Sequence, residues 1–267
     1  MPESTDTGID RGGPGTPKVF RAEPAQTDLR SVLENEGASA FRKYQELNVG
    51  SPGPWAFARY ELLLVLLSGL PGAAGYFLRQ KLYRALWGRC GRGVVIGRNV
   101  TIRHPHRIVL GDRVVIDDHC VLDAKGTLPT TIVIGDDVLL GRNTVLSCKG
   151  GTIRLDDRAN VSVNCTFISE SELEIGARTL VGGHCYLIAG GNHGIERTDV
   201  PILDQPRLEK GGVHVRENCW LGASVTVLDG ATIGRDSVIA AGAVVTEPIP
   251  EFAIAAGVPA RVVRERR

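Results

Sequence analysis

The sequence predicts a mostly β protein, a parallel β-helix of short repeats preceded by a helical extension. Three observations lead to this prediction. From Val94 onward, an aliphatic residue recurs about every six positions. Glycine accounts for 33 of the 267 residues and aromatic residues for only 5%, whereas an average protein has about 7% glycine. The segment before Val94 lacks the six-residue period and has helical patterns instead.

Each repeat begins with an aliphatic residue, often followed by glycine, as in residues 96–101 (IGRNVT) and 110–115 (LGDRVV). In each repeat a small residue lies four positions after the aliphatic residue, and the aliphatic residue of the next repeat lies two positions further on. In a strand, residues two apart have their side chains on the same face. Three such strands close a coil of 18 residues, the separation between Val215 and Ile233. Coils stacked about 4.8 Å apart form a narrow prism that holds aliphatic side chains and has little room for rings.

Successive coils are expected to start at equivalent aliphatic residues, namely Leu110, Ile134, Leu155, Ile175, Val215 and Ile233. These starts are separated by 24, 21, 20, 40 and 18 residues. The long interval contains an excursion over residues 190–212, which includes His193, Arg197 and Asp199. Long loops that leave a rigid scaffold are usually functional or disordered. The composition of this loop favours function.

The cysteines and the charge balance exclude several classes of protein. The chain has six cysteines and no C-x-x-C pair, so a zinc ribbon is not expected, and the setting is predicted to be reducing and cytoplasmic. Four cysteines fall on the small inward position of a repeat, where they act as small hydrophobes: Cys120, Cys165, Cys185 and Cys219. Lysine plus arginine number 31 against 30 acidic residues, which gives no electrostatic footprint for nucleic acid.

The N-terminal third is expected to comprise a disordered leader, residues 1–28, and a helical extension, residues 29–93. The run at residues 62–70 (LLLVLLSGL) spans about 14 Å as a helix, against roughly 30 Å for a bilayer core. Basic residues interleaved with apolar ones follow it: Arg79, Lys81, Arg84 and Arg89.

Three interpretations of residues 55–89 stay open. The segment contacts a membrane surface, packs as a cap on the β-helix, or, least favoured, spans a bilayer despite Pro71. The first would bring the protein to the inner face of the cell membrane.

The C-terminal coils contain an ordered series of motifs: residues 217–223 (ENCWLGA), 227–234 (VLDGATIG), 238–246 (VIAAGAVVT) and 256–263 (AGVPARVV). With these motifs, residues 94–264 resemble the hexapeptide-repeat acyltransferases. The resemblance is strongest to maltose and galactoside O-acetyltransferases and to relatives encoded with polysaccharide biosynthesis. It implies a left-handed β-helix, acetyl-CoA as the acyl donor, and a homotrimer with active sites between subunits.

In this family a histidine in the excursion before the final coils acts as general base, and His193 in residues 191–194 (GNHG) matches that place. A sugar hydroxyl is a poor nucleophile near pH 7, and imidazole titrates near pH 6.5. A histidine base takes the hydroxyl proton as the oxygen attacks the thioester. General-base assistance of this kind raises the reaction rate by about 10²–10⁴-fold.

The resemblance also assigns groups around the reacting carbonyl. The backbone N–H of Ala223 would stabilise the oxyanion, Trp220 would wall the acyl pocket, and Asn164 would contact the acceptor. Each side chain has a plainer interpretation. Trp220 can be an ordinary ring at a strand end, and Asn164 can stack at a turn of the β-helix.

Coenzyme A is expected along the C-terminal coils, at positions that match the family: Ala241, Thr246, Arg261 and Arg264. Arginine suits the nucleotide phosphates, although a solvated basic tail would look the same. One position departs from the family, where lysine commonly follows the threonine. Here Glu247 does, which weakens the expected grip on CoA.

The sequence therefore predicts an acyl-CoA-dependent O-acyltransferase, acetyl being the expected acyl group, that acts on a hydroxyl of a saccharide or lipid-linked glycan by direct transfer. Two alternatives stay open: an N-acetyltransferase acting on an amino sugar, and a non-enzymatic trimeric scaffold. A γ-type carbonic anhydrase needs three zinc-bound histidines, two of them five apart, and no H-x4-H occurs. No metal is expected, and the remaining histidines are interpreted as structural or surface residues: His104, His106, His119, His184 and His214.

Overall fold

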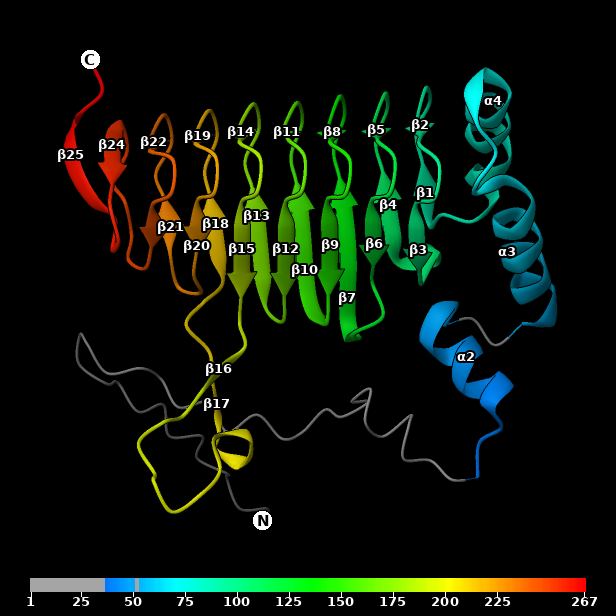
Figure 1. The fold of residues 1–267 in the computed structure, drawn as a ribbon, viewed down its shortest axis with the longest axis horizontal. Helices are drawn as coiled ribbons and strands as arrows, with labels where there is room; N and C mark the ends of the chain where they lie inside the picture. The colour runs from blue at the N-terminus through cyan, green and yellow to red at the C-terminus, as the bar shows by residue number, and fades with distance from the viewer. Residues whose placement is uncertain (1–36, 51–52) are drawn as a thin grey trace, which may run out of the picture.

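The structure, a computed structural model, describes residues 37–50 and 53–267. In these ranges the chain forms a parallel β-helix with helices at its N-terminal end (Figure 1). This confirms the predicted fold class, including the N-terminal helical extension. The leader predicted for residues 1–28 lies outside the described residues.

Three sheets run along the prism, each built from one strand per coil. The first contains β1 (Arg89–Cys90), β4 (Ile108–Leu110), β7 (Thr127–Ile134), β10 (Gly150–Leu155), β13 (Glu172–Ile175), β18 (Val213–Val215) and β21 (Thr232–Ile233). The second contains β2 (Val95–Ile96), β5 (Val115–Ile116), β8 (Leu139–Leu140), β11 (Asn160–Val161), β14 (Leu180–Val181), β19 (Trp220–Leu221), β22 (Val238–Ile239), β24 (Ala253–Ala256) and β25 (Arg261–Glu265). The third contains β3 (Thr101–Arg103), β6 (Val121–Asp123), β9 (Val145–Cys148), β12 (Thr166–Ser169), β15 (Tyr186–Ala189), β20 (Thr226–Val227) and β23 (Val244–Val245).

The register of the first sheet follows the six-residue period. Its strands pair in parallel so that the predicted coil starts lie in one column, in the order Leu110, Ile134, Leu155, Ile175, Val215 and Ile233. Cys90 pairs with Leu110 ahead of this column. The first strand of the prism therefore begins at Arg89, five residues before the start expected from the repeats.

The corners of the prism differ in detail from the expected glycine turn. The left-handed residue at each corner is usually not glycine: Asn99 has φ 53° and Asn218 has φ 56°. The preceding glycines instead make room for the next coil. A Cβ on Gly97 would lie 2.5 Å from the backbone nitrogen of Asp118, and one on Gly222 would lie 2.6 Å from that of Ala241.

The core contains the inward side chains of every coil, mostly Val, Ile and Leu. The four cysteines at the small inward position are buried, as expected. Each of the four also donates through Sγ to a glycine carbonyl of the next coil: Cys120 to Gly141 at 3.2 Å, Cys165 to Gly182 at 3.1 Å, Cys185 to Gly222 at 3.2 Å and Cys219 to Gly234 at 3.1 Å. Burial raises the pKa of the Cys120 and Cys219 thiols to about 11, so these two stay protonated at neutral pH. One ring does fit inside the prism, because Phe167 on β12 is fully buried.

The helical extension covers the open end of the first coil. It contains α2 (Ala40–Asn48), α3 (Pro54–Leu67), α4 (Gly72–Leu82) and the 3₁₀-helix η1 (Tyr83–Ala85). Tyr60 Oη donates to the carbonyl of Ile102 at 2.6 Å. The buried Arg79 donates through Nε to the carbonyl of Ile96 at 2.9 Å and through Nη1 to Leu67 at the end of α3 at 2.9 Å. One face of the extension therefore packs on the prism, as the cap interpretation expects.

No helix in the described ranges is both long enough and apolar enough to cross a membrane.

A buried histidine joins α2 to the prism and makes the cap sensitive to acid. The backbone N–H of His104 donates to the carbonyl of Asn48 at 2.9 Å. Burial, with smaller contributions from Arg107 and His106, lowers the pKa of His104 from 6.5 to about 4. As the pH falls through this window the unfolded chain binds the proton first, so the stability that neutral His104 provides above pH 6.5 is lost progressively toward pH 4.

We expect His104→Asn to reduce the loss of melting temperature between pH 7.5 and pH 5. Asparagine tolerates the left-handed backbone at this position, where φ is 52°. Circular dichroism melts of the variant and the unsubstituted protein at both pH values measure the difference. His119→Asn changes an exposed histidine at another left-handed corner and should leave the loss unchanged. Equal losses in all three proteins would contradict the assignment.

Candidate active site

Residues 190–212 connect β15 to β18. This excursion projects from one edge of the prism (Figure 1, yellow). Its arms form a two-stranded antiparallel ribbon, β16 (Asn192–His193) with β17 (Arg207–Leu208), in which His193 lies opposite Arg207. The 3₁₀-helix η3 (Ile202–Asp204) lies in its outer part. The predicted base thus lies on a paired segment close to the prism.

One buried carboxylate closes the base of the excursion. Asp229, 5% exposed, follows β20 and accepts from both arms. Its oxygens receive Asn192 Nδ2 at 2.7 Å, the N–H of Lys210 at 3.2 Å and the N–H of Gly212 at 2.9 Å. Asn192 is the neighbour of His193, so this clamp fixes the outgoing arm where the candidate base lies. Asp229 was not among the residues expected from the sequence, although an aspartate followed by glycine is a local signal of a turn; Gly230 indeed has φ 88°.

The outer part of the excursion is also tied together by hydrogen bonds. Gln205 is buried, and its Nε2 donates to the carbonyls of Arg197 at 2.7 Å and Val200 at 3.1 Å. The N–H of Gly194 donates to the carbonyl of Pro206 at 2.8 Å. The segment that holds His193 is therefore supported on both sides.

The ring of His193 is half-buried, and its two nitrogens differ. Nδ1 is buried, and no group in the described part of the chain hydrogen-bonds to it. A general base is normally oriented by a partner on the ring nitrogen that does not meet the substrate. The described residues of one chain do not supply that partner for His193.

Asn164 and His193 lie at different corners of the prism. Asn164 occupies a left-handed corner before β12, with φ 58°. Its Oδ1 accepts from Asn143 Nδ2 at 3.0 Å, and its Nδ2 lies 3.4 Å from His184 Nε2. β12 and β15 pair in parallel, so Asn164 before one and His193 after the other lie at opposite ends of these strands. Within one chain, the structure does not bring the two predicted residues together.

Trp220 and Ala223 lie around the same corner of the prism as Asn164. Trp220 is on β19 with its ring exposed, and Ala223 follows in the turn to β20. The close approach of Gly222 to the Ala241 backbone stacks this turn directly on the next one. The structure therefore joins the predicted oxyanion position and one predicted CoA position, Ala241, in a single column.

The remaining predicted CoA positions lie near the C-terminal end. Thr246 follows β23, and Arg261 and Arg264 are exposed on β25. Arg261 Nη1 lies 3.6 Å from Glu247 Oε2. Glu247, the residue that departs from the family motif, therefore pairs with the arginine that was expected to bind phosphate. Arg264 Nη1 donates to the carbonyl of Glu265 at 3.2 Å.

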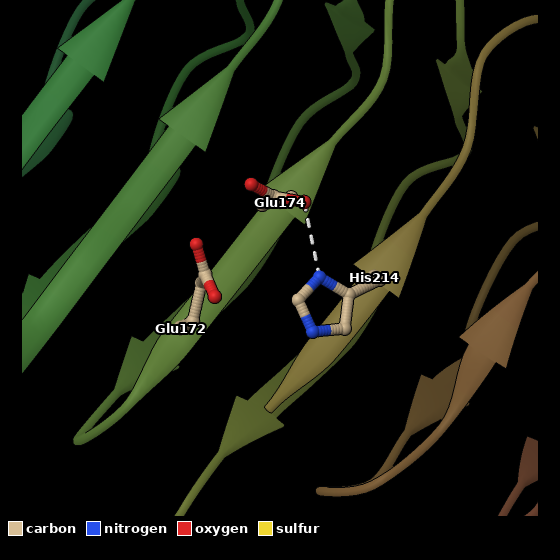
Figure 2. Close-up of side chains that lie close together, drawn as sticks. All are labelled: Glu172, Glu174 and His214. Atoms are coloured by element: carbon tan, nitrogen blue, oxygen red, sulfur yellow. Dashed lines mark hydrogen bonds and ion pairs between the residues drawn. The ribbon is translucent and has the colours of Figure 1, made fainter. Parts of the chain in front are cut away.

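A group of possible metal ligands lies next to the excursion. Figure 2 shows Glu172 and Glu174 on β13 beside His214 on β18, with ligand atoms within 4.8 Å of one another. Both nitrogens of His214 already have partners, Nδ1 with Glu174 Oε2 at 3.0 Å and Nε2 with the Gly211 carbonyl at 3.0 Å. The hydrogen bond from His214 lowers the pKa of Glu174. His214 thus anchors the returning arm of the excursion, in line with the structural role expected for it.

Residues 212–247 match the family model described as bacterial transferase hexapeptide (six repeats). Among curated relatives, a probable acetyltransferase of Mycobacterium tuberculosis is 35% identical over 117 residues, which cover 44% of this chain and 38% of that protein. The galactoside O-acetyltransferase of Lactococcus lactis is 37% identical over 108 residues, which cover 38% of this chain and 47% of that protein. The chain thus spans less than half the length of these two relatives.

Among solved structures, the N-acyltransferase AntD of Bacillus cereus, in complex with dTDP and 3-hydroxybutyryl-CoA, is 23% identical in sequence. The similarity covers 71% of this chain and 88% of that one, with a TM-score of 0.49. From its sequence matches, the chain carries the hexapeptide repeat of the bacterial transferases and has named acetyltransferases as its relatives.

Proposed function

We propose that this protein is an acyl-CoA-dependent O-acyltransferase that transfers an acetyl group to a hydroxyl of a saccharide or lipid-linked glycan. The observation that carries the proposal is the place of His193, on a clamped excursion from an otherwise regular prism. The similarity to a galactoside O-acetyltransferase supports the hydroxyl acceptor.

The chemistry follows from the two nitrogens of His193. Because Nδ1 is buried, Nε2 is the nitrogen that meets the acceptor. It takes the hydroxyl proton while the oxygen attacks the thioester carbonyl carbon of acetyl-CoA. The tetrahedral intermediate then collapses and the C–S bond breaks. The imidazolium donates its proton to the departing sulfur, so CoA leaves as the thiol and His193 returns to the neutral form. The N–H of Ala223 is the proposed donor to the oxyanion.

The separation of His193 from the Asn164 corner favours a site shared between copies of the chain. Asn164, Trp220 and Ala223 lie around one corner, at the other end of the strand pair from His193. A site composed of His193 from one subunit and this corner from the next supplies every predicted group. A homotrimer with three such sites satisfies this arrangement by symmetry, and the neighbouring subunit then provides the partner of Nδ1.

Coenzyme A would lie along the column that contains Ala223 and Ala241, with its phosphates toward Arg261 and Arg264. Both arginines are exposed on the last strand, and Arg261 can exchange Glu247 for phosphate because their contact is long and solvated. The chain supplies only part of the usual positive charge here.

Replacing the candidate base tests the proposal directly. We expect His193→Ala to lower kcat by about 10²–10⁴-fold with little change in the KM for acetyl-CoA, measured as CoA release with a panel of saccharide acceptors. His119→Asn is the matched control at an exposed corner and should retain activity. Full transfer by His193→Ala would contradict the assignment. Transfer to amino sugars alone, regained by the variant at high pH, would instead identify an N-acetyltransferase.

Asp229 is expected to act as a positioning residue for His193. Asp229→Ala removes the acceptor of three donors and releases both arms of the excursion. The N–H of Gly212 is the buried one of the three, and leaving it unpaired costs about 1–3 kcal/mol. We expect a fall in kcat of about tenfold or more, unchanged affinity for CoA by calorimetry, and an unchanged midpoint of the pH–rate profile. Asp156→Ala removes an exposed carboxylate and serves as control. A lower melting temperature with unchanged kcat would make the role of Asp229 purely structural.

Glu247→Lys is expected to tighten CoA binding. The change frees Arg261 and adds a third cation near the phosphates, beside Arg261 and Arg264, so we expect a Kd about fivefold lower and a steeper dependence on salt. Titration calorimetry at two salt concentrations measures both effects. Glu172→Lys makes the same charge change on β13 and should leave the Kd unchanged. An unchanged Kd for Glu247→Lys would place the phosphates elsewhere.

A further inference from the structure

The helical extension presents an apolar surface away from the prism. α3 and α4 stand across the end of the prism opposite β25 (Figure 1). They bury Tyr60, Leu67 and Arg79 toward it. Large apolar side chains of both helices are exposed, and we call this set the outer cap surface: Trp55, Leu62, Val65, Leu66, Tyr76, Phe77 and Leu82.

Contacts on the inner side of α3 and α4 keep the outer cap surface facing away from the prism. Tyr60 and Arg79 each bond to carbonyls of the first coil, so neither helix can rotate to bury its outer side. Leu62, Val65 and Leu66 follow the helical spacing that places them in one stripe. Val65 is 78% exposed and Trp55 is 86% exposed. Apolar stripes of this kind on a rigid support usually mark a docking surface.

The charges around this surface indicate the chemistry of the partner. Residues 54–89 contain five basic residues and one acidic residue, whereas the whole chain is nearly balanced at 31 to 30. The single acid, Glu61, accepts from Tyr44 Oη at 2.8 Å. The exposed cations of this segment are Arg59, Lys81, Arg84 and Arg89. Lys81 Nζ lies 5.8 Å from the Phe77 ring centroid, so cationic and apolar groups alternate over short distances.

We propose that the outer cap surface docks on an anionic lipid bilayer, beyond the acyl-transfer activity. An apolar interior beneath negatively charged headgroups complements a stripe of Leu and Val bordered by Lys and Arg. α3 has 14 residues, a rise of about 21 Å, and one of its sides is packed on the prism. The helices therefore lie in the plane of the interface, with Leu62, Val65 and Leu66 at the headgroup–acyl boundary. The prism then stands away from the bilayer.

Flotation of the purified full chain with vesicles tests the proposal. We expect binding to vesicles of phosphatidylcholine with 30% phosphatidylglycerol and much weaker binding to pure phosphatidylcholine.

Two sets of variants separate the apolar from the charged contribution. The bound fraction should fall at least fivefold in the triple variant Leu62→Ser, Val65→Ser and Leu66→Ser. The preference for anionic lipid should disappear in the double variant Lys81→Glu and Arg84→Glu. Leu203→Ser and Arg178→Glu, an exposed leucine and an exposed arginine outside the cap, are the matched controls.

Two further measurements separate lipid from other partners. Bromine-labelled lipids should quench the fluorescence of Trp55, and Trp55→Phe should remove most of that quenching. Circular dichroism and the melting temperature check that the triple serine variant stays folded, as expected for solvent-exposed positions. If the triple variant lowers the oligomer mass by light scattering while vesicle binding stays the same, the surface is an interface between copies and the proposal is wrong. Absence of anionic-vesicle binding by the unsubstituted protein would overturn it as well.

Discussion

A strand of two residues holds its place in a sheet only when neighbouring strands pair with it along both edges. In this prism most strands of the second sheet are that short, and each coil provides the pairing partners of the next. The two ends of the stack would otherwise be open edges, which are costly and prone to association. Arg79 and Tyr60 bond to edge carbonyls of the first coil, at Ile96 and Ile102, and β25 pairs antiparallel with β24 at the other end.

The same constraint explains how the chain can carry a long excursion. β13 and β18 remain paired on either side of it, with Leu173 opposite Val213, so the stack continues as though the loop were absent. The two arms of the loop must also be held together at the base, where they leave and rejoin the prism. Asp229, from the following coil, does this by accepting from both arms. A rigid stack and a clamped loop together fix the backbone of His193.

The prism could be predicted from the sequence because its rule is local and repeats. The inward positions accept only small or aliphatic side chains, so Leu110, Ile134 and the later coil starts are visible in the sequence and align in the structure. The glycine pattern marked the corners, but not for the expected reason. The glycines lie where the next coil leaves no space for a Cβ, whereas the left-handed residue of the turn is usually Asn, His, Arg or Asp. Asp229 was missed because its side-chain partner Asn192 lies 37 residues away, and no period connects them.

The family resemblance names the residues of the candidate site but not the chain that provides each one. Asn164 and His193 lie at opposite ends of a strand pair, so catalysis by both requires at least two copies. A cyclic oligomer whose axis runs along the prisms keeps their direction the same. All N-terminal caps then lie at one end of the assembly. Under that symmetry, weak contact of one outer cap surface with lipid becomes multivalent, and avidity rather than the affinity of a single cap sets the strength of docking.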